Sequence, residues 1–138
     1  MQLNPYLLME GTSRAALGFY AEVLGTDAPN ITTYGDMPEE MNIPDEVKDL
    51  VAHGAITVGS NQIMATDKVD LWHKDYKGIH GVSMQLEIKT VDEATRLFEA
   101  FSGDGGSVTM PLGPTFWAEA FGTCTDKFGV DWMISVSK

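Results

Sequence analysis

Two stretches of this chain decide its fold: TSRAALGFYAEVLG, residues 12–25, and TVDEATRLFEAFSG, residues 90–103. In both, apolar residues recur three and four positions apart, which is the spacing of one face of a helix. In the first stretch these residues are Ala16, Phe19, Tyr20, Val23 and Leu24, and in the second they are Ala94, Leu97, Phe98 and Phe101. Each stretch therefore predicts an amphipathic helix.

Both predicted helices carry residues that start and stop helices. Thr12 or Ser13 is expected to cap the first, and Thr90 with Glu93 forms the Thr-x-x-Glu capping box of the second. A glycine follows the last apolar residue of each, where helices commonly end. The two glycines are Gly25 and Gly103.

The similarity extends beyond the helices. A shift of 78 positions, from Thr12 to Thr90, also places PYLLME (residues 5–10) on SMQLEI (residues 83–88), so a strand precedes each helix. Strand-like segments follow each helix, with turn residues between them. These segments are HGAITVGSNQIMATD (53–67), SVTMP (107–111), FWAEAFGTCTD (116–126) and GVDWMISV (129–136). The sequence predicts one α+β domain, residues 1–138, made of two βαβββ modules (1–70 and 81–138) and a connector, 71–80.

Residues 82–88 alternate between apolar and polar, which is the period of a strand. The apolar members are expected to pack on the following helix, and the polar members to lie on the opposite, concave face. The polar members are Ser83, Gln85 and Glu87. In the last hairpin, Asp126 and Gly129 are expected to form the turn, and Trp132 to enter the core.

The charge of the chain excludes some partners. It has 20 acidic and 9 basic residues, a net charge of −11, which argues against nucleic acid or an anionic membrane as partner. No apolar run approaches the ~20 residues of a membrane helix. MQLNPYLLMEG at the N-terminus lacks the features of a signal peptide, so we expect a cytoplasmic protein. The one cysteine, Cys124, excludes an internal disulfide and a cysteine-rich zinc site, and is expected to fill space in a strand.

Several motifs together resemble a known family, and they cover nearly the whole chain. They are PYLLMEG (5–11), ALGFYAEVLG (16–25), HGAITVG (53–59), IMATD (63–67) and MPLGPTFWAEAFGTCTDKFGVDW (110–132). With them the chain resembles the vicinal oxygen chelate superfamily of glyoxalase I, bleomycin-resistance proteins and extradiol dioxygenases, and within it the PhnB-like branch. The resemblance implies a glyoxalase-like fold in which the modules form a curled mixed sheet around a cup, and it implies a homodimer.

The resemblance also implies where a metal ion would be held. Members of the superfamily that use a metal supply four side chains, usually His and Glu, two from the first and last strands of each module. Carried over by spacing, these positions are Pro5, Ser83, Met133 and either Ile63 or Met64. A register error of one residue offers only Asn4 or Glu10. Because none of these completes a set of ligands for zinc, nickel, iron or magnesium, we predict no metal site and no cofactor.

Six residues are the candidates for contact with a small-molecule ligand. They are His53, Ser83, Gln85, Glu87, Trp117 and Glu119. Trp117, with Phe116 and Phe121, is suited to form apolar walls, and Glu87 or Glu119 could act as a general base beside them. Each also has a plainer interpretation as a solvated or core residue.

We therefore predict a small-molecule binding protein that uses a cup in a homodimer without a complete metal site. Two alternatives remain: a metal-dependent lyase or isomerase of the glyoxalase type, and a non-catalytic scaffold protein. Nothing in the sequence identifies the ligand.

Overall fold

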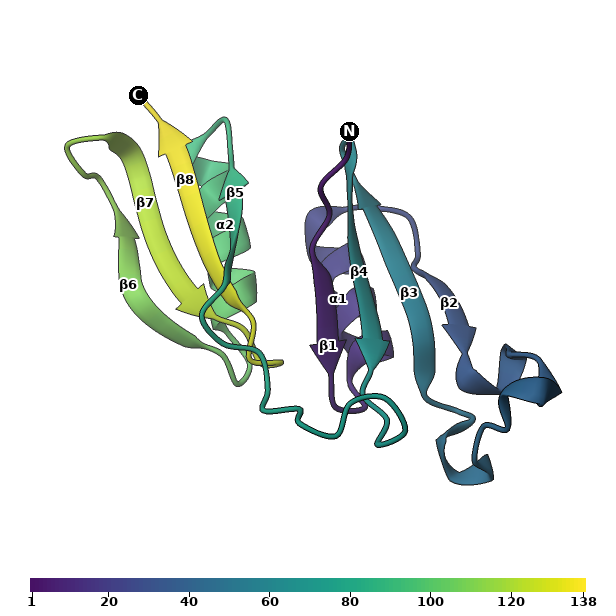
Figure 1. Cartoon of the computed structure of the whole chain (residues 1–138). Helices are drawn as coiled ribbons and strands as arrows, with labels where there is room; N and C mark the ends of the chain where they lie inside the picture. Colours follow the sequence, from purple (N-terminus) through teal and green to yellow (C-terminus); the bar gives the residue numbers. More distant parts are fainter. The chain divides into compact units, whose positions relative to one another are not determined.

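The computed structural model describes residues 1–138 and divides the chain into two compact units, which we call unit 1 (Met1–Gly78) and unit 2 (Ile79–Lys138). The boundary lies within the predicted connector, residues 71–80. Figure 1 shows that each unit consists of a helix packed on one face of a sheet. Each unit is described by itself.

Unit 1 contains one helix, four strands and three short 3-10 turns. In chain order they are β1 (Tyr6–Met9), α1 (Ser13–Leu24), β2 (Asn30–Thr33), η1 (Tyr34–Asp36), η2 (Glu39–Met41), η3 (Asp45–Val47), β3 (Val51–Val58) and β4 (Asn61–Asp67). The strand order is β1-β4-β3-β2. The pair β1–β4 is parallel, and the other two pairs are antiparallel.

Unit 2 repeats this arrangement without the 3-10 turns. Its elements are β5 (Ser83–Glu87), α2 (Val91–Ser102), β6 (Ser107–Gly113), β7 (Ala118–Thr125) and β8 (Asp131–Ser137). The order β5-β8-β7-β6, with a parallel β5–β8 pair, is that of unit 1. The predicted α+β class and the two βαβββ modules are thereby confirmed.

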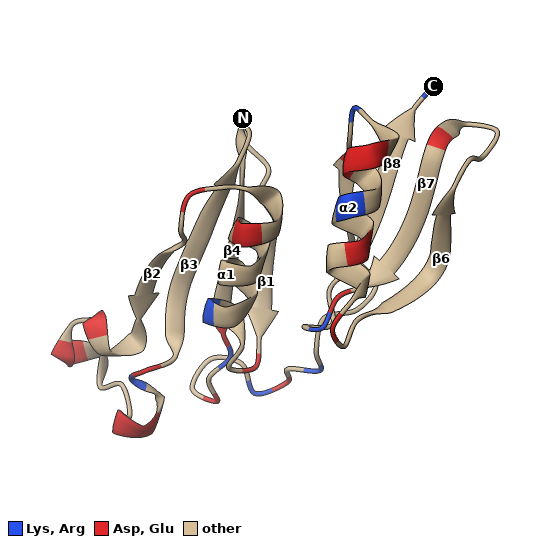
Figure 2. Cartoon of the chain, turned by 180° about the vertical axis from the view of Figure 1, so that it is seen from behind, with Lys and Arg blue, Asp and Glu red and all other residues tan.

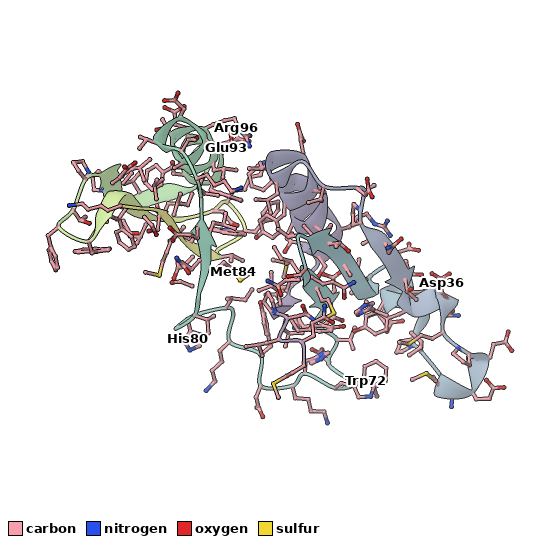
Figure 3. All side chains as sticks on the ribbon, turned by 90° about the horizontal axis from the view of Figure 1, so that it is seen from above. Asp36, Trp72, His80, Met84, Glu93 and Arg96 are labelled. Carbon is pink, nitrogen blue, oxygen red and sulfur yellow. The ribbon has the colours of Figure 1, made fainter.

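The helix ends follow the sequence in part. Gly25 has φ 68°, a left-handed conformation that glycine adopts without strain, and it ends α1 as predicted. The Thr90 hydroxyl accepts a hydrogen bond from the Glu93 backbone N–H (3.2 Å) and so caps α2. The other half of the predicted capping box is replaced, because the Glu93 carboxylate binds the Arg96 guanidinium at 2.7 and 2.9 Å instead (Figure 3).

The core of each unit lies between its helix and its sheet. In unit 2, Trp132 is buried and its ring stacks on Phe101 of α2, with centroids 4.2 Å apart, as the alternation of β8 predicted. Cys124 is also buried in β7. Burial raises the pKa of its thiol from 9.0 to about 11, so it is a protonated, space-filling residue.

In each unit, one buried carboxylate accepts hydrogen bonds from separate parts of the chain and holds them together. In unit 1, Asp67 accepts hydrogen bonds from the backbone N–H groups of Ser13 (3.0 Å) and Val51 (2.9 Å), which joins the start of α1 to the start of β3. In unit 2, Asp126 accepts from the backbone N–H of Val130 (3.1 Å) and from the Trp132 indole (2.8 Å). The predicted turn at Asp126 and Gly129 is confirmed, and it is tied to the core.

The first strand departs from the sequence prediction by one residue. Leu7 and Met9 are buried under α1, whereas Tyr6 is 49% exposed and Leu8 is half-buried. In β5 the less exposed side belongs to Met84 and Leu86 instead, which are half-buried. The shift of 78 positions that aligns the helices therefore fails in the strands, and Gly11, with φ 79°, lies in the loop where the two repeats change register.

Neither helix is long and apolar enough to cross a bilayer, since each has 12 residues. A membrane-spanning helix takes about 20 residues.

Candidate functional site

The face of each sheet that its helix leaves uncovered is here called its open face. In unit 2, Ser83, Gln85 and Glu87 are exposed on the open face of β5, as the alternation predicted. In unit 1, His53 lies on the open face of β3 and is exposed. The structure thus places one of the six predicted ligand-binding residues in unit 1 and the others in unit 2.

On each open face, a polar residue of the first strand lies opposite a methionine of the last strand, with which that strand pairs in parallel. In unit 1, Tyr6 of β1 is paired with Met64 of β4, and in unit 2, Gln85 of β5 is paired with Met133 of β8. Both methionines are half-buried, whereas Ile63 is buried on the helix side. Met64, and not Ile63, therefore occupies the open-face position of β4.

His53 is hydrogen-bonded to Tyr6, one member of the Tyr6–Met64 pair. The Tyr6 hydroxyl lies 2.7 Å from His53 Nδ1, and the two ring centroids are 5.5 Å apart. Partial burial raises the pKa of Tyr6, with a smaller contribution from Tyr34, so its phenol stays protonated and can donate to Nδ1 or accept from it. In the tautomer in which Nδ1 accepts, Nε2 carries the proton and can donate to a ligand.

Glu87 is held in place by its neighbours on the open face of unit 2. Its Oε1 accepts hydrogen bonds from the Ser137 hydroxyl and from the Ser137 backbone N–H (2.9 Å), and Oε2 accepts from Gln85 Nε2 (3.3 Å). The Ser137 hydroxyl in particular holds the pKa of Glu87 below its usual value. A carboxylate with a lowered pKa is a weaker base, which argues against the predicted role of Glu87 as a general base.

The three predicted wall aromatics form a cluster of two exposed rings and one half-buried ring, which we call the aromatic patch (Phe116, Trp117 and Phe121). Trp117 meets Phe121 edge to face at 5.4 Å and Phe116 at 4.8 Å. Phe116 is 89% exposed and Trp117 is 50% exposed. Glu119 is exposed on the same side of β7 as Phe121. Apolar area of this kind on a surface commonly marks a binding site.

Ser83 lies apart from these groups along the sheet. It is paired with Asp131 of β8, whose Oδ1 accepts a hydrogen bond from the Thr125 hydroxyl at 2.6 Å. The structure therefore brings Gln85 and Glu87 together through a hydrogen bond, and Trp117 and Phe121 through ring contact.

The sequence prediction missed Tyr6 as the hydrogen-bond partner of His53. Its carry-over placed the first ligand position at Pro5, but the open-face residue of β1 is Tyr6. Asn4, the one-residue alternative, accepts a hydrogen bond from the Gln62 backbone N–H (2.9 Å). No signal in PYLLME distinguishes the two faces, because both are apolar.

The donor set of the two open-face pairs can be tested by its chemistry. On β5 this pair contains Gln85, whereas the sequence carry-over named Ser83. The open-face pairs offer a phenol, a carboxamide and two thioethers, from Tyr6, Gln85, Met64 and Met133. Zinc, iron and magnesium prefer imidazole, thiolate or carboxylate ligands. These side chains do not fit such an ion.

Unit 1 also contains a hollow beside the open face of β1. Its volume is about 380 Å³, and Leu8 and residues 71–76 line it. Burial of the Tyr76 phenol in this region raises its pKa. The segment after β4 thus forms one side of a hollow whose other side is a strand.

A repeated βαβββ module defines the fold class of this protein. The chain belongs to the Glyoxalase/Bleomycin resistance protein/Dioxygenase superfamily, which it matches over residues 2–134. This confirms the predicted superfamily.

Relatives of known sequence and structure agree with this assignment. The chain is 32% identical to Protein YjdN of Escherichia coli over 149 aligned positions, which cover 100% of this chain and 97% of that protein. Protein PA1353 from Pseudomonas aeruginosa is 41% identical, with a TM-score of 0.88 and coverage of 99% of this chain and 98% of that one. The PhnB protein from Bacillus cereus, 24% identical with a TM-score of 0.77 over 99% and 100% of the chains, shares the fold.

Proposed function

We propose that this protein binds an organic small molecule on the open faces of its sheets, without a protein-held metal ion. The observation that supports the proposal is the pair of matching cross-strand contacts, Tyr6–Met64 and Gln85–Met133. Side chains of these types make poor ligands for hard metal ions but good contacts for an organic molecule, since methionine adapts its shape and the polar groups supply direction.

The hydrogen-bonding groups on each open face are already oriented. His53 is fixed by Tyr6, and Glu87 is fixed by Ser137 and Gln85. Groups that are held before the ligand arrives lose less conformational entropy on binding, which strengthens affinity. The aromatic patch adds apolar surface to unit 2.

Screening by thermal shift, in the presence of a chelator, tests the proposal because a ligand specific to the folded state raises the melting temperature. A compound found in this way should bind about tenfold more weakly to the variant Tyr6→Phe or Gln85→Ala, through loss of a hydrogen bond. Thr95→Ala, on the solvent side of α2, is the matched control and should leave binding unchanged. The proposal fails if compounds bind only when metal is added, or if both open-face variants bind normally.

We also propose that the protein is a homodimer, as the family resemblance implies. Sedimentation equilibrium should then give twice the mass of the 15.1 kDa chain. A monomer at micromolar concentration would contradict this part of the proposal.

A further inference from the structure

Unit 1 contains a second cavity, whose lining differs from that of the open faces. Its volume is about 170 Å³. A dry engineered cavity of about 150 Å³ accepts benzene, so this space suits a group of that size. Its lining includes two aromatic rings, two carboxylates and aliphatic side chains: Tyr34, Trp72, Glu46, Asp70, Ile43 and Val47.

The aromatic walls are fixed in position. Tyr34 is buried, and its hydroxyl donates to the Asp67 backbone carbonyl at 2.8 Å. Trp72 stands on a tight turn in which its own backbone N–H and that of His73 both donate to the Val69 carbonyl (3.1 and 2.8 Å). The two rings lie 5.8 Å apart at an angle of 34°. Figure 3 labels Trp72 beside the end of the sheet of unit 1.

The electrostatic character of the cavity is negative. No lysine, arginine or histidine lines it. The two lysines nearest in sequence pair with carboxylates: Lys48 with Asp45 at 2.8 Å, which lowers the pKa of Asp45, and Lys68 with Asp70 of the lining itself at 3.3 Å. The negative character of the cavity therefore comes from Glu46. Figure 2 shows acidic residues along the 3-10 turns of unit 1, of which η3 contributes Glu46 and Val47 to the lining.

We propose that this cavity binds a small organic cation, of the size and chemistry of a quaternary ammonium group. An aromatic ring attracts a cation through its negative face, and tryptophan does so best. The aliphatic walls favour methyl groups over a hydrated metal ion, and Glu46 supplies a counter-charge. An anion or a strongly hydrated cation gains neither contact. The site is separate from the open-face site proposed above and does not depend on it.

Choline is the probe, and 3,3-dimethyl-1-butanol, which has the same shape without charge, is its control. Both are titrated into the full chain at constant ionic strength while the indole N–H signals of the three tryptophans are recorded. Choline should shift the Trp72 signal saturably below about 50 mM, and the alcohol should bind about tenfold more weakly. A linear, unsaturated response to choline, or equal binding of the alcohol, would overturn the proposal.

Variants locate the site. Trp72→Leu should weaken choline binding about tenfold, followed through the backbone N–H signals of Ile43 and Val47, and Glu46→Gln about threefold. Trp72→Phe keeps an aromatic face, so it should retain affinity within about threefold and separates a loss of the ring from a loss of folding. Thr95→Ala, at an exposed position of α2, is the control and should leave choline binding unchanged. Normal binding by a folded Trp72→Leu protein would refute the assignment.

Discussion

The two units have one strand order, and the largest difference between them lies in one connection. In unit 1, residues 34–50 join β2 to β3 through three 3-10 turns, whereas in unit 2 only residues 114–117 join β6 to β7. The longer connection brings apolar side chains of its own: Met37, Ile43, Val47 and Leu50 pack against Tyr34, Ala52 and Val69. The short one leaves Phe116 and Trp117 exposed.

This difference shows how a duplicated fold acquires unequal surfaces. The scaffold is equivalent in both units, but one carries a walled cavity with acidic residues and the other an aromatic patch. Function therefore has to be argued from each unit's own side chains and not from the fold that they share. The comparison can be tested at positions where the units match.

The largest effect is expected at the two buried aspartates. Asp126→Ala should lower the free energy of unfolding by about 4 kcal/mol, because it leaves the Trp132 indole and the backbone N–H groups of Phe128 and Val130 without their acceptor. Asp67→Ala removes two such bonds and should cost about 3 kcal/mol. Urea unfolding measures both. Equal stability of either variant and the parent protein would show that these carboxylates do not fasten the units.

Gly54 in unit 1 and Gly122 in unit 2 both lie on the sheet face that the helix covers. The cost of adding a methyl group at each position compares how tightly the two units are packed. A Cβ at Gly122 would lie 2.8 Å from the backbone Cα of Leu112, whereas a Cβ at Gly54 would lie 2.6 Å from the flexible end of Leu17. Since backbone moves less easily than a side-chain end, Gly122→Ala should cost about 3 kcal/mol and Gly54→Ala about 1 kcal/mol. The reverse order in urea unfolding would contradict this account of the packing.

Because of Cys124, the stability of unit 2 should fall as the pH becomes alkaline. The folded pKa of about 11 exceeds the ordinary 9.0, so the stabilisation is complete below about pH 9 and is lost as pH rises toward 11. Relative to Cys124→Ala, the parent protein should lose about 2 kcal/mol across that window. The measurement is the difference in unfolding free energy at the two ends of the window. A difference that stays constant with pH would show that the thiol ionises as readily in the folded chain as in the unfolded one.

The smallest effect is expected at the helix caps. Thr90 accepts a hydrogen bond from Glu93, but the Thr12 side chain makes no capping bond. Thr90→Ala should therefore destabilise by about 1 kcal/mol and Thr12→Ala by about 0.2 kcal/mol. Thermal unfolding distinguishes them, and equal losses would mean that the cap of α2 adds nothing.

The sequence could predict most of the fold because its patterns are unambiguous where they matter. Three patterns each predicted a single structure: the periodicity of the helices, the glycine that ends α1 and the alternation of β5. The burial of Trp132 followed from the alternation of β8. In β1 the pattern did not show which side chains face the helix, since Tyr6, Leu7, Leu8 and Met9 are all apolar or aromatic. That ambiguity placed Pro5 where the open face carries Tyr6.

The candidate site was less predictable because its contacts cross strands. The Tyr6–His53 bond joins residues far apart in sequence, and its geometry depends on the register of β1 with β4 and of β4 with β3. The low pKa of Glu87 depends on Ser137, which no local pattern links to β5. The cavity at Trp72 lies between two segments that are separate in sequence, the connection from β2 to β3 and the residues after β4, and no local pattern links them.

Methionine methyl signals test the central claim most directly, because Met64 and Met133 lie on the open faces whereas Met9 is buried under α1. The spectrum is recorded with a compound from the thermal-shift screen and a chelator in excess. The account predicts saturable shifts of the Met64 and Met133 signals with Met9 unmoved. Shifts of neither open-face methionine, or shifts that appear only after a divalent metal replaces the chelator, would contradict it.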